Sequence, residues 1–323
     1  MSVLRISASL VVGCLVGCLA GCQVATPAEP PAEPVSDDNL DLEGGSYEAS
    51  ALSALTDDPS DCSLASTVLG PQWQPTSTLR IPVVVHIIAD ANCTTGAVSN
   101  QDVANQIASL NEDYRATPGT PGQAGADSRI EFVLATTDPA GQPTTGITRD
   151  CNATWYRDKG NYYNTLAWDT SRYMNLYVNS AAGSRGYTFL PADPAGPRGT
   201  KADRIVINHL AFGRPGPFAP YNLGRTVTHE TGHYLGLFHT YFDGCGVPTA
   251  PSCYTTGDRL CDTAPNATSH KGCPVITACG GVTAPVHNYM ELTDDACLTG
   301  FTAEQVQRMR CSLATYRPLL TTP

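Results

Sequence analysis

The amino-acid sequence predicts an α/β (α+β) fold built around a mixed sheet. Three features support this class: short β-branched runs, intervening stretches with helical periodicity, and Gly- and Pro-rich turns such as Asp138–Gly141. Strands that alternate with helices in this way imply a mixed α/β sheet. The 323 residues are 41% hydrophobic, which is enough to build a substantial core.

Four segments are expected to form strands. The first, Ile81–Ile88, is a β-branched run typical of a buried strand, and ordered structure is expected to begin there. The other three are also short and apolar, and turn residues separate them. They are Ile130–Ala135, Met174–Val178 and Ile205–Asn208.

Two segments outside the functional motif are expected to form helices. The first follows Ser99, a favourable N-cap residue, and carries an apolar stripe with a spacing of three and four. The stripe consists of Val103, Ile107, Leu110 and Tyr114. The second helix opens with a capping box between Thr302 and Gln305 and is expected to end near Tyr316.

The N-terminus has the features of an export signal. Residues 1–22 contain Arg5, an apolar run and the small-residue ending Leu19-Ala20-Gly21-Cys22. This ending resembles the lipobox of bacterial lipoproteins, so Cys22 is expected to be lipidated. Cys18 fits nearly as well, and an ordinary secretory signal is the alternative. Because no later stretch is apolar enough to span a bilayer, membrane attachment is expected only through this lipid anchor.

Composition divides the rest of the chain. Residues 23–61 are rich in Pro, Ala and acidic residues and are expected to form a disordered tether. Residues 62–80 are either a removable prosegment or the start of the folded domain, which continues over residues 81–323. The tether and residues 62–80 carry ten acidic residues against the single Arg80, so the net charge of −11 arises mainly there. The sequence of the folded part therefore gives no sign of the basic surface that nucleic-acid binding requires.

The cysteine content indicates an oxidising compartment. The chain has 13 cysteines but lacks the regular Cys-x-x-Cys pairs of metal clusters. Disulfides are therefore the simpler interpretation.

The segment Thr228–His239 carries the strongest functional signal. It reads His-Glu-x-x-His-x-x-Gly-x-x-His. On a helix, His229 and His233 lie one turn apart on the same face, so both imidazoles can reach one ion. At Gly236 the backbone can adopt a positive φ, which ends the helix and returns the chain beneath it. His239 is thereby expected to supply the third ligand.

This residue set predicts zinc-dependent hydrolysis. Three neutral nitrogen ligands leave the fourth zinc position open, as in catalytic sites, whereas structural sites are closed. Zinc makes a water molecule more acidic and polarises a scissile carbonyl. Glu230 lies beside the metal, so it is expected to take the proton from water and pass it to the leaving amine. A chance origin among core histidines is roughly a one-in-100,000 event at this chain length.

The extended motif resembles that of the metzincin zinc peptidases, whose second hallmark is a methionine turn beneath the metal. Met290 follows at the expected distance. Local sequences narrow the resemblance to the pappalysin family, which includes ulilysin-like enzymes. They are Ile81–His86, Leu110–Tyr114, Thr144–Arg149, Gly224–Thr228, Gly272–Pro274, His287–Met290 and Asp294–Cys297. The resemblance covers about Ile81 to Arg317. It implies a metzincin catalytic domain over residues 81–323: a twisted mixed sheet, an active-site helix and a smaller disulfide-rich C-terminal subdomain.

The resemblance also implies two disulfides between the zinc helix and the methionine turn. They are Cys245–Cys279 and Cys273–Cys297. Cys253 and Cys261 lie in an apparent insertion and are expected to pair locally. Three pairings remain open for the last four cysteines, Cys62, Cys93, Cys151 and Cys311. A free Cys62 bound to zinc, as in some latent metzincins, is an alternative that would leave one of these four unpaired.

Further site residues follow from the resemblance. Asp262 and Thr263 lie where similar enzymes place calcium ligands, and oxygen ligands suit calcium. Asp294 and Asp295 follow the methionine turn, where a carboxylate in the pocket wall favours Arg or Lys after the scissile bond; two turn or helix-capping residues are the alternative. Leu292 replaces the usual family tyrosine and cannot donate a hydrogen bond, so reduced or retuned activity is expected.

The expected function is zinc-dependent endopeptidase activity on extracellular proteins or peptides, before Arg or Lys. The protein is expected to be exported and either lipid-anchored at the cell envelope or secreted. One alternative is a surface-anchored zinc-binding structural or binding protein with little turnover, and another is a hydrolase of non-peptide amides. Glu230 favours catalysis, because a purely structural zinc site has no use for a general base beside an open position.

Overall fold

The computed structural model describes residues 60–321. The predicted signal sequence, the lipidation of Cys22 and nearly all of the predicted tether lie outside these residues. The described chain forms one six-stranded sheet in the order β2-β1-β4-β6-β5, with β3 also paired to β1. The strands are β1 (Leu79–Ala89), β2 (Ile130–Leu134), β3 (Ile147–Cys151), β4 (Met174–Asn179), β5 (Gly186–Tyr187) and β6 (Ile205–Asn208).

Strand β1 is the centre of the sheet. Its first half pairs with β2 and its second half with β3 along one edge, and β4 pairs along the other edge, all in parallel. Strand β5 runs antiparallel to β6, so the sheet is mixed, as predicted. The four predicted strands form β1, β2, β4 and β6. Strands β3 and β5 were not predicted, because β3 is largely polar and β5 spans two residues.

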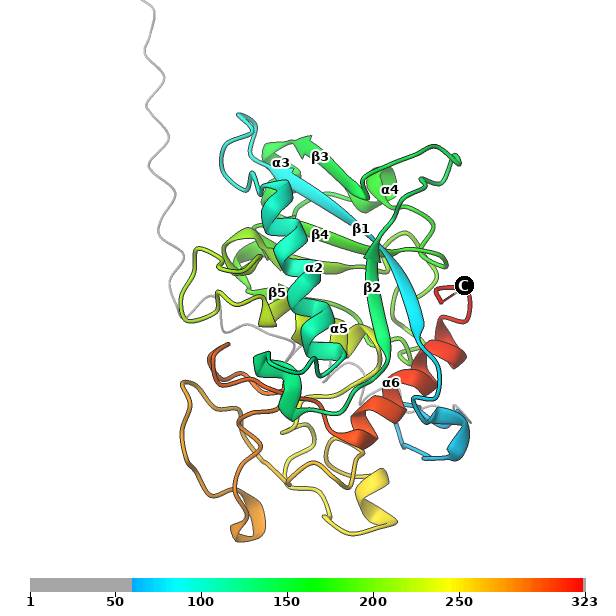
Figure 1. The fold of residues 1–323 in the computed structure, drawn as a ribbon, viewed down its shortest axis with the longest axis vertical. Coiled ribbons are helices and arrows are strands. Elements are labelled where there is room, and N and C mark those ends of the chain that lie inside the picture. The colour runs from blue at the N-terminus through cyan, green and yellow to red at the C-terminus, as the bar shows by residue number, and fades with distance from the viewer. Residues whose placement is uncertain (1–59, 322–323) are drawn as a thin grey trace, which may run out of the picture. The chain divides into compact units, whose positions relative to one another are not determined.

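Three longer helices accompany the sheet: α2 (Asn100–Tyr114), α5 (Arg225–Tyr234) and α6 (Ala303–Tyr316). The predicted N-cap at Ser99 is present and forms a capping box with Asp102, and the predicted capping box at Thr302 is also present. Helix α2 lies across the sheet with α5 close to its C-terminal end, as Figure 1 shows. Side chains of the sheet, α2, α5 and α6 share one large hydrophobic core. A smaller, tyrosine-rich cluster packs around Tyr162 and Tyr177.

The remaining helices are short. The α-helices are α3 (Ala153–Tyr156) and α4 (Tyr163–Leu166). The 3₁₀ turns are η2 (Pro71–Trp73), η3 (Pro121–Ala124), η4 (Ala181–Gly183), η5 (His209–Ala211), η6 (Ser252–Tyr254) and η7 (Cys279–Gly281). Within residues 60–321, none of the helices combines the length and apolar character needed to cross a bilayer.

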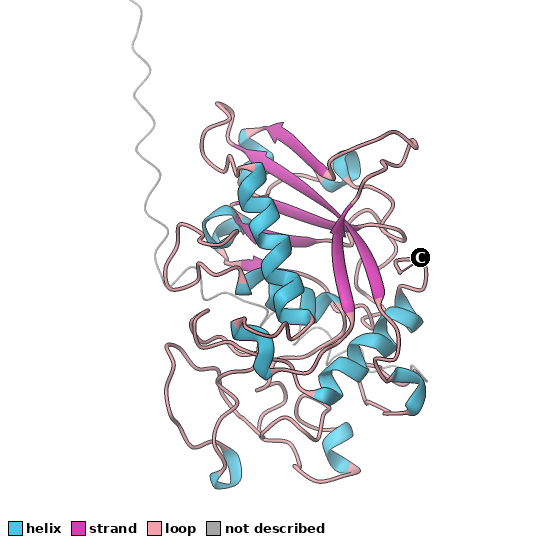
Figure 2. Cartoon of the chain, in the orientation of Figure 1, coloured by secondary structure: helices cyan, strands magenta, loops and turns pink. Residues whose placement is uncertain are grey.

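The chain between α5 and α6 forms the expected C-terminal subdomain, which consists mostly of loops (Figure 2). Its disulfides pair as the sequence suggested: Cys245–Cys279, Cys253–Cys261 and Cys273–Cys297. Cross-links hold this region together because it has little regular hydrogen bonding of its own.

The other disulfides settle the open pairings as Cys62–Cys311 and Cys93–Cys151. Cys62 is therefore bonded to α6 and is not a zinc ligand. The expectation that ordered structure begins at Ile81 was wrong, since residues 60–78 already pack on the domain through this disulfide and through buried Leu64. Those contacts come from residues distant in sequence, so local periodicity gives no sign of them.

Candidate active site

Helix α5 carries the first half of the functional motif and is buried along its entire length. It begins after Gly224, which has φ 82°, and its last helical residue is Tyr234. Gly236 has φ 92°, a left-handed conformation that favours glycine and reverses the chain direction. The chain then runs back toward the helix and places His239 beside His229 and His233, as predicted.

The three histidines converge through one nitrogen each. The Nε2 atoms of His229, His233 and His239 lie 3.1 Å from one another in all three pairs. Three nitrogens bound about 2.0–2.1 Å from a tetrahedral zinc ion would lie about 3.3 Å apart, so this set fits zinc. Burial, followed by the neighbouring His239, lowers the pKa of His229 well below its usual value. The neutral imidazole that results is the form that binds a metal.

Backbone carbonyls orient two of these rings. His229 Nδ1 lies 2.7 Å from the Tyr289 carbonyl oxygen, and His233 Nδ1 lies 2.8 Å from the Leu237 carbonyl oxygen. Each Nδ1–H therefore donates to a carbonyl, and the tautomer that results leaves Nε2 free to bind the ion.

Glu230 lies beside the triad, buried under the edge strand β5. The strand makes room for it at Gly186, where an added Cβ would come within 3.0 Å of Glu230 Cγ and 2.9 Å of Ile207 Cδ1. A side chain at this position would force Ile207 or Glu230 to shift. Nothing in the sequence around Gly186 indicated this role, because the contact joins residues 44 positions apart.

Met290 packs directly beneath α5. A Cβ at Gly232 would lie 2.4 Å from Met290 Sδ, so only glycine admits the methionine at this point in the helix. The Met290 carbonyl also accepts a hydrogen bond from Thr240 N, the residue after His239, at 3.2 Å. The methionine turn therefore contacts both the zinc helix and the residue that follows His239.

Asp113 on α2 joins the zinc helix to the methionine turn. Its carboxylate accepts hydrogen bonds from Thr228 Oγ1 at 2.6 Å and from Tyr289 OH at 2.8 Å, and Arg225 Nη2 lies 3.1 Å away. Tyr289 in turn orients His229 through its carbonyl oxygen. This positioning role was missed. The available signal was an acidic residue three positions after Leu110, on the apolar face of the helix.

The structure does not bring Asp262 and Thr263 together at one site. Asp262 Oδ2 accepts a hydrogen bond from Glu304 N at the start of α6. Thr263 instead lines a cavity of about 20 Å³ together with Asp258. Thr263 Oγ1 and Asp258 Oδ2 are both buried in it, and the Thr263 hydroxyl lies close enough to stabilise the Asp258 carboxylate. Burial raises the pKa of Asp258 to about 7.

Asp294 and Asp295 differ in their surroundings. Asp295 is buried, and its Oδ2 accepts hydrogen bonds from Leu223 N at 2.7 Å and Arg225 N at 3.1 Å, at the start of α5. It is therefore a helix-capping group, as in the alternative considered from sequence. Asp294 is half-buried, and its Oδ1 accepts a hydrogen bond from Gly272 N.

Comparison with known proteins places this geometry in a family. Residues 146–314 match the peptidase family described as pregnancy-associated plasma protein-A. An extracellular metalloprotease of Pyricularia oryzae is 32% identical over 280 residues, which cover 84% of this chain and 85% of that protein. A second one, from Verticillium alfalfae, is 32% identical over 250 residues, which cover 75% and 78%.

Solved structures agree with the sequence relatives. Mature mirolysin of Tannerella forsythia in complex with a cleaved peptide has a TM-score of 0.60 and 33% identity, covering 77% of this chain and 100% of that chain. A mutant promirolysin from the same organism has a TM-score of 0.63 and 33% identity, covering 77% and 86%. Family membership implies zinc, which the histidine triad fits. The chain belongs to the pappalysin family of metzincins and is a metalloendopeptidase.

Proposed function

We propose that the protein is a zinc-dependent endopeptidase in which Glu230 is the general base and His229, His233 and His239 hold the metal. The observation that carries this proposal is the convergence of three Nε2 atoms, 3.1 Å apart, beside a buried glutamate. When bound, zinc supplies Lewis acidity at the scissile carbonyl. Glu230 takes a proton from the attacking water and passes it to the leaving amine nitrogen.

Digestion of a proteome-derived peptide library tests this function. Internal cleavage should disappear after treatment with a zinc chelator and return on addition of zinc. The structure of mirolysin with a cleaved peptide supports peptides as the substrate class. Cleavage that survives complete zinc removal would contradict the mechanism. Full zinc loading without any cleavage would favour the alternative of a zinc-binding structural protein.

Export is proposed on two grounds. The relatives are named extracellular metalloproteases. Five disulfides join ten cysteines in the described part of the chain, and such bonds persist in oxidising compartments. Lipid attachment at Cys22 remains a prediction from the signal-like sequence.

The preference for Arg or Lys after the scissile bond is proposed to depend on Asp294. Asp295 already accepts hydrogen bonds from two backbone amides, those of Leu223 and Arg225, where α5 begins. Asp294 Oδ1 accepts one from Gly272 N, and this side chain is half-exposed. We expect wild-type products to begin with Arg or Lys and Asp294→Asn to reduce that enrichment at least 10-fold, because removing one partner of a partly buried ion pair costs about 2–5 kcal/mol.

Sequencing the new N-termini of the cleaved library measures this preference. Asp295→Asn serves as the comparison, because it should lower stability through loss of the cap while keeping the enrichment. Wild-type cleavage before apolar residues would reject the proposal. Loss of the Arg and Lys enrichment only in Asp295→Asn would mean that Asp295, and not Asp294, recognises the basic side chain.

A calcium ion is proposed to bind Asp258 and Thr263, in place of the pair Asp262 and Thr263. The cavity has room for about one water-sized species, and it is lined by two oxygen-bearing side chains of the kind that calcium binds, the buried Asp258 carboxylate and the buried Thr263 hydroxyl. Calcium should raise the Tm of the wild type by several degrees, because it compensates a buried carboxylate. Asp258→Asn should abolish this shift and Asp262→Asn should retain it. The reverse result, observed by thermal unfolding with and without calcium, would restore the original assignment.

A further inference from the structure

Arg308, on α6, lies directly behind the turn that links the zinc ligands. Its Nε donates a hydrogen bond to the Gly236 carbonyl oxygen at 2.8 Å. Its guanidinium carbon lies 4.8 Å from the centre of the Phe238 ring. The same side chain therefore contacts both ends of the segment Gly236–Phe238.

The Gly236–Phe238 segment fixes the positions of two of the three zinc ligands, His233 and His239. The Leu237 carbonyl accepts the hydrogen bond from His233 Nδ1, and His239 follows Phe238 directly. The turn is also pressed against α6, since a Cβ at Gly236 would lie 2.8 Å from Ser312 Oγ. A shift of the turn relative to α6 would move one ligand and the carbonyl that orients another.

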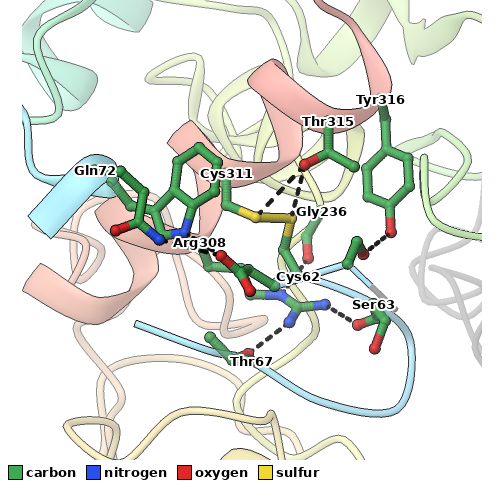
Figure 3. Close-up of a disulfide and its surroundings, with 12 residues drawn as sticks. Cys62, Ser63, Thr67, Gln72, Gly236, Arg308, Cys311, Thr315 and Tyr316 are labelled. Atoms are coloured by element: carbon green, nitrogen blue, oxygen red, sulfur yellow. Dashed lines mark hydrogen bonds between the residues drawn. A yellow bond between two sulfur atoms is a disulfide. The ribbon is translucent and has the colours of Figure 1, made fainter. Parts of the chain in front are cut away.

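The opposite side of Arg308 is occupied by the N-terminal segment, residues 60–68. Arg308 Nη2 donates to the Ser63 carbonyl at 2.7 Å, and Nη1 donates to Thr67 Oγ1 (Figure 3). Nη1 also donates to the Ser66 carbonyl at 3.1 Å. The Arg308 guanidinium therefore lies between residues 60–68 and the Gly236–Phe238 turn. Leu64 adds an apolar contact, because it belongs to the same buried cluster as Phe238.

The Cys62–Cys311 disulfide fixes this segment covalently. Cys311 lies three residues after Arg308, on the same side of α6, and the bond closes a sequence separation of 249 residues. Thr67 N also donates to the Tyr254 carbonyl at 2.9 Å, which ties the segment to the C-terminal subdomain. The disulfide at Cys62 and the hydrogen bond at Thr67 thus hold both ends of the stretch that Arg308 contacts.

Because the guanidinium of Arg308 is charged, the loss of its hydrogen bonds would be strongly unfavourable. The side chain is fully buried, and each hydrogen bond recorded for it goes to a neutral oxygen. Burial lowers the pKa of Arg308 to about 10, which reflects the cost of holding the charge there. Removal of residues 60–68 would take away three of its four hydrogen bonds and open the guanidinium to water, so the side chain would no longer be held in place against the Gly236 carbonyl.

We propose that residues 60–68 are a permanent part of the working enzyme and that Arg308 is a positioning residue, which transmits their support to the Gly236–Phe238 turn and so to His233 and His239. The inference rests on the proposed zinc site. It assigns residues 62–80 to the folded domain and excludes a removable prosegment there. Any maturation cleavage is expected before Cys62.

The first test is the zinc dissociation constant of Arg308→Lys, measured by competition with a chromogenic chelator. Lysine keeps the charge but not the planar fork of donors, so zinc should bind about 10-fold more weakly, at the lower end of the effect of outer-shell changes. Arg310→Lys is the matched control on the same helix, since Arg310 donates to Ser128 O and Ser77 Oγ. The control should stay within about two-fold of wild type.

The second test keeps Arg308 and removes the cross-link by the double change Cys62→Ser and Cys311→Ser. Zinc affinity, measured well below the Tm, should again fall several-fold, whereas the double change Cys93→Ser and Cys151→Ser should leave it unchanged. Unaltered zinc affinity in both Arg308→Lys and the Cys62/Cys311 variant would overturn the positioning role. This readout does not require peptide cleavage, so it separates failure of this inference from failure of the proposed function.

Intact-mass analysis of the non-reduced mature enzyme tests the permanence of the segment. We expect the chain to include Cys62 and the mass to correspond to a closed Cys62–Cys311 bond. A fully active enzyme whose N-terminus lies beyond Thr67 would overturn the proposal.

Discussion

Glu230→Gln is expected to lower kcat/KM for peptide hydrolysis by at least about 100-fold, which is the usual loss when a general base is removed. The amide has the same shape as the carboxylate but cannot take a proton from water. The substitution leaves the three Nε2 atoms and the carbonyls that orient His229 and His233 unchanged, so the variant should bind about one zinc per chain. The measurements are zinc content, thermal unfolding and peptide turnover on the same preparation.

Glu131→Gln provides the control for this change. Glu131 lies on β2, at the opposite edge of the sheet from β5, and pairs with Arg80 and Arg115. It should retain wild-type turnover. If Glu230→Gln hydrolyses peptides at a comparable rate with normal zinc content, Glu230 is not the base.

His239→Ala is expected to remove both zinc and activity. It deletes one of three converging Nε2 atoms, and the two remaining nitrogens cannot hold a tetrahedral ion with similar strength. The loss of zinc affinity should exceed the 10- to 100-fold change typical of outer-shell substitutions. Chelator competition and bound-metal analysis after dialysis measure it directly.

His287→Ala controls for the loss of a histidine. Its Nδ1 contacts the Cys297 carbonyl, and its side chain is exposed. This variant should keep zinc and turnover. Stoichiometric zinc in His239→Ala would mean that another residue supplies the third ligand, and the turn at Gly236 would then need a different explanation.

Short-range patterns in the sequence predicted the fold class and the centre of the site. The apolar runs gave β1, β2, β4 and β6, because buried strands require continuous apolar stretches. The N-cap residue Ser99 and the capping box at Thr302 located the starts of α2 and α6, because capping hydrogen bonds span only three residues. The zinc motif was equally visible, since His229 and His233 lie one turn apart and Gly236 ends the helix within the same twelve-residue segment.

Interactions between distant segments were decided only by the tertiary structure. Asp113 meets Tyr289 across 176 positions, and Arg308 meets Ser63 across 245. The same holds for the choice of Cys311 as the partner of Cys62 and for the use of Asp295 as the cap of α5. In each case a polar or charged side chain becomes buried and must find its partner in whatever segment the fold brings next to it. Local periodicity records which face of an element is apolar, but it carries no information on which distant backbone will lie against that face.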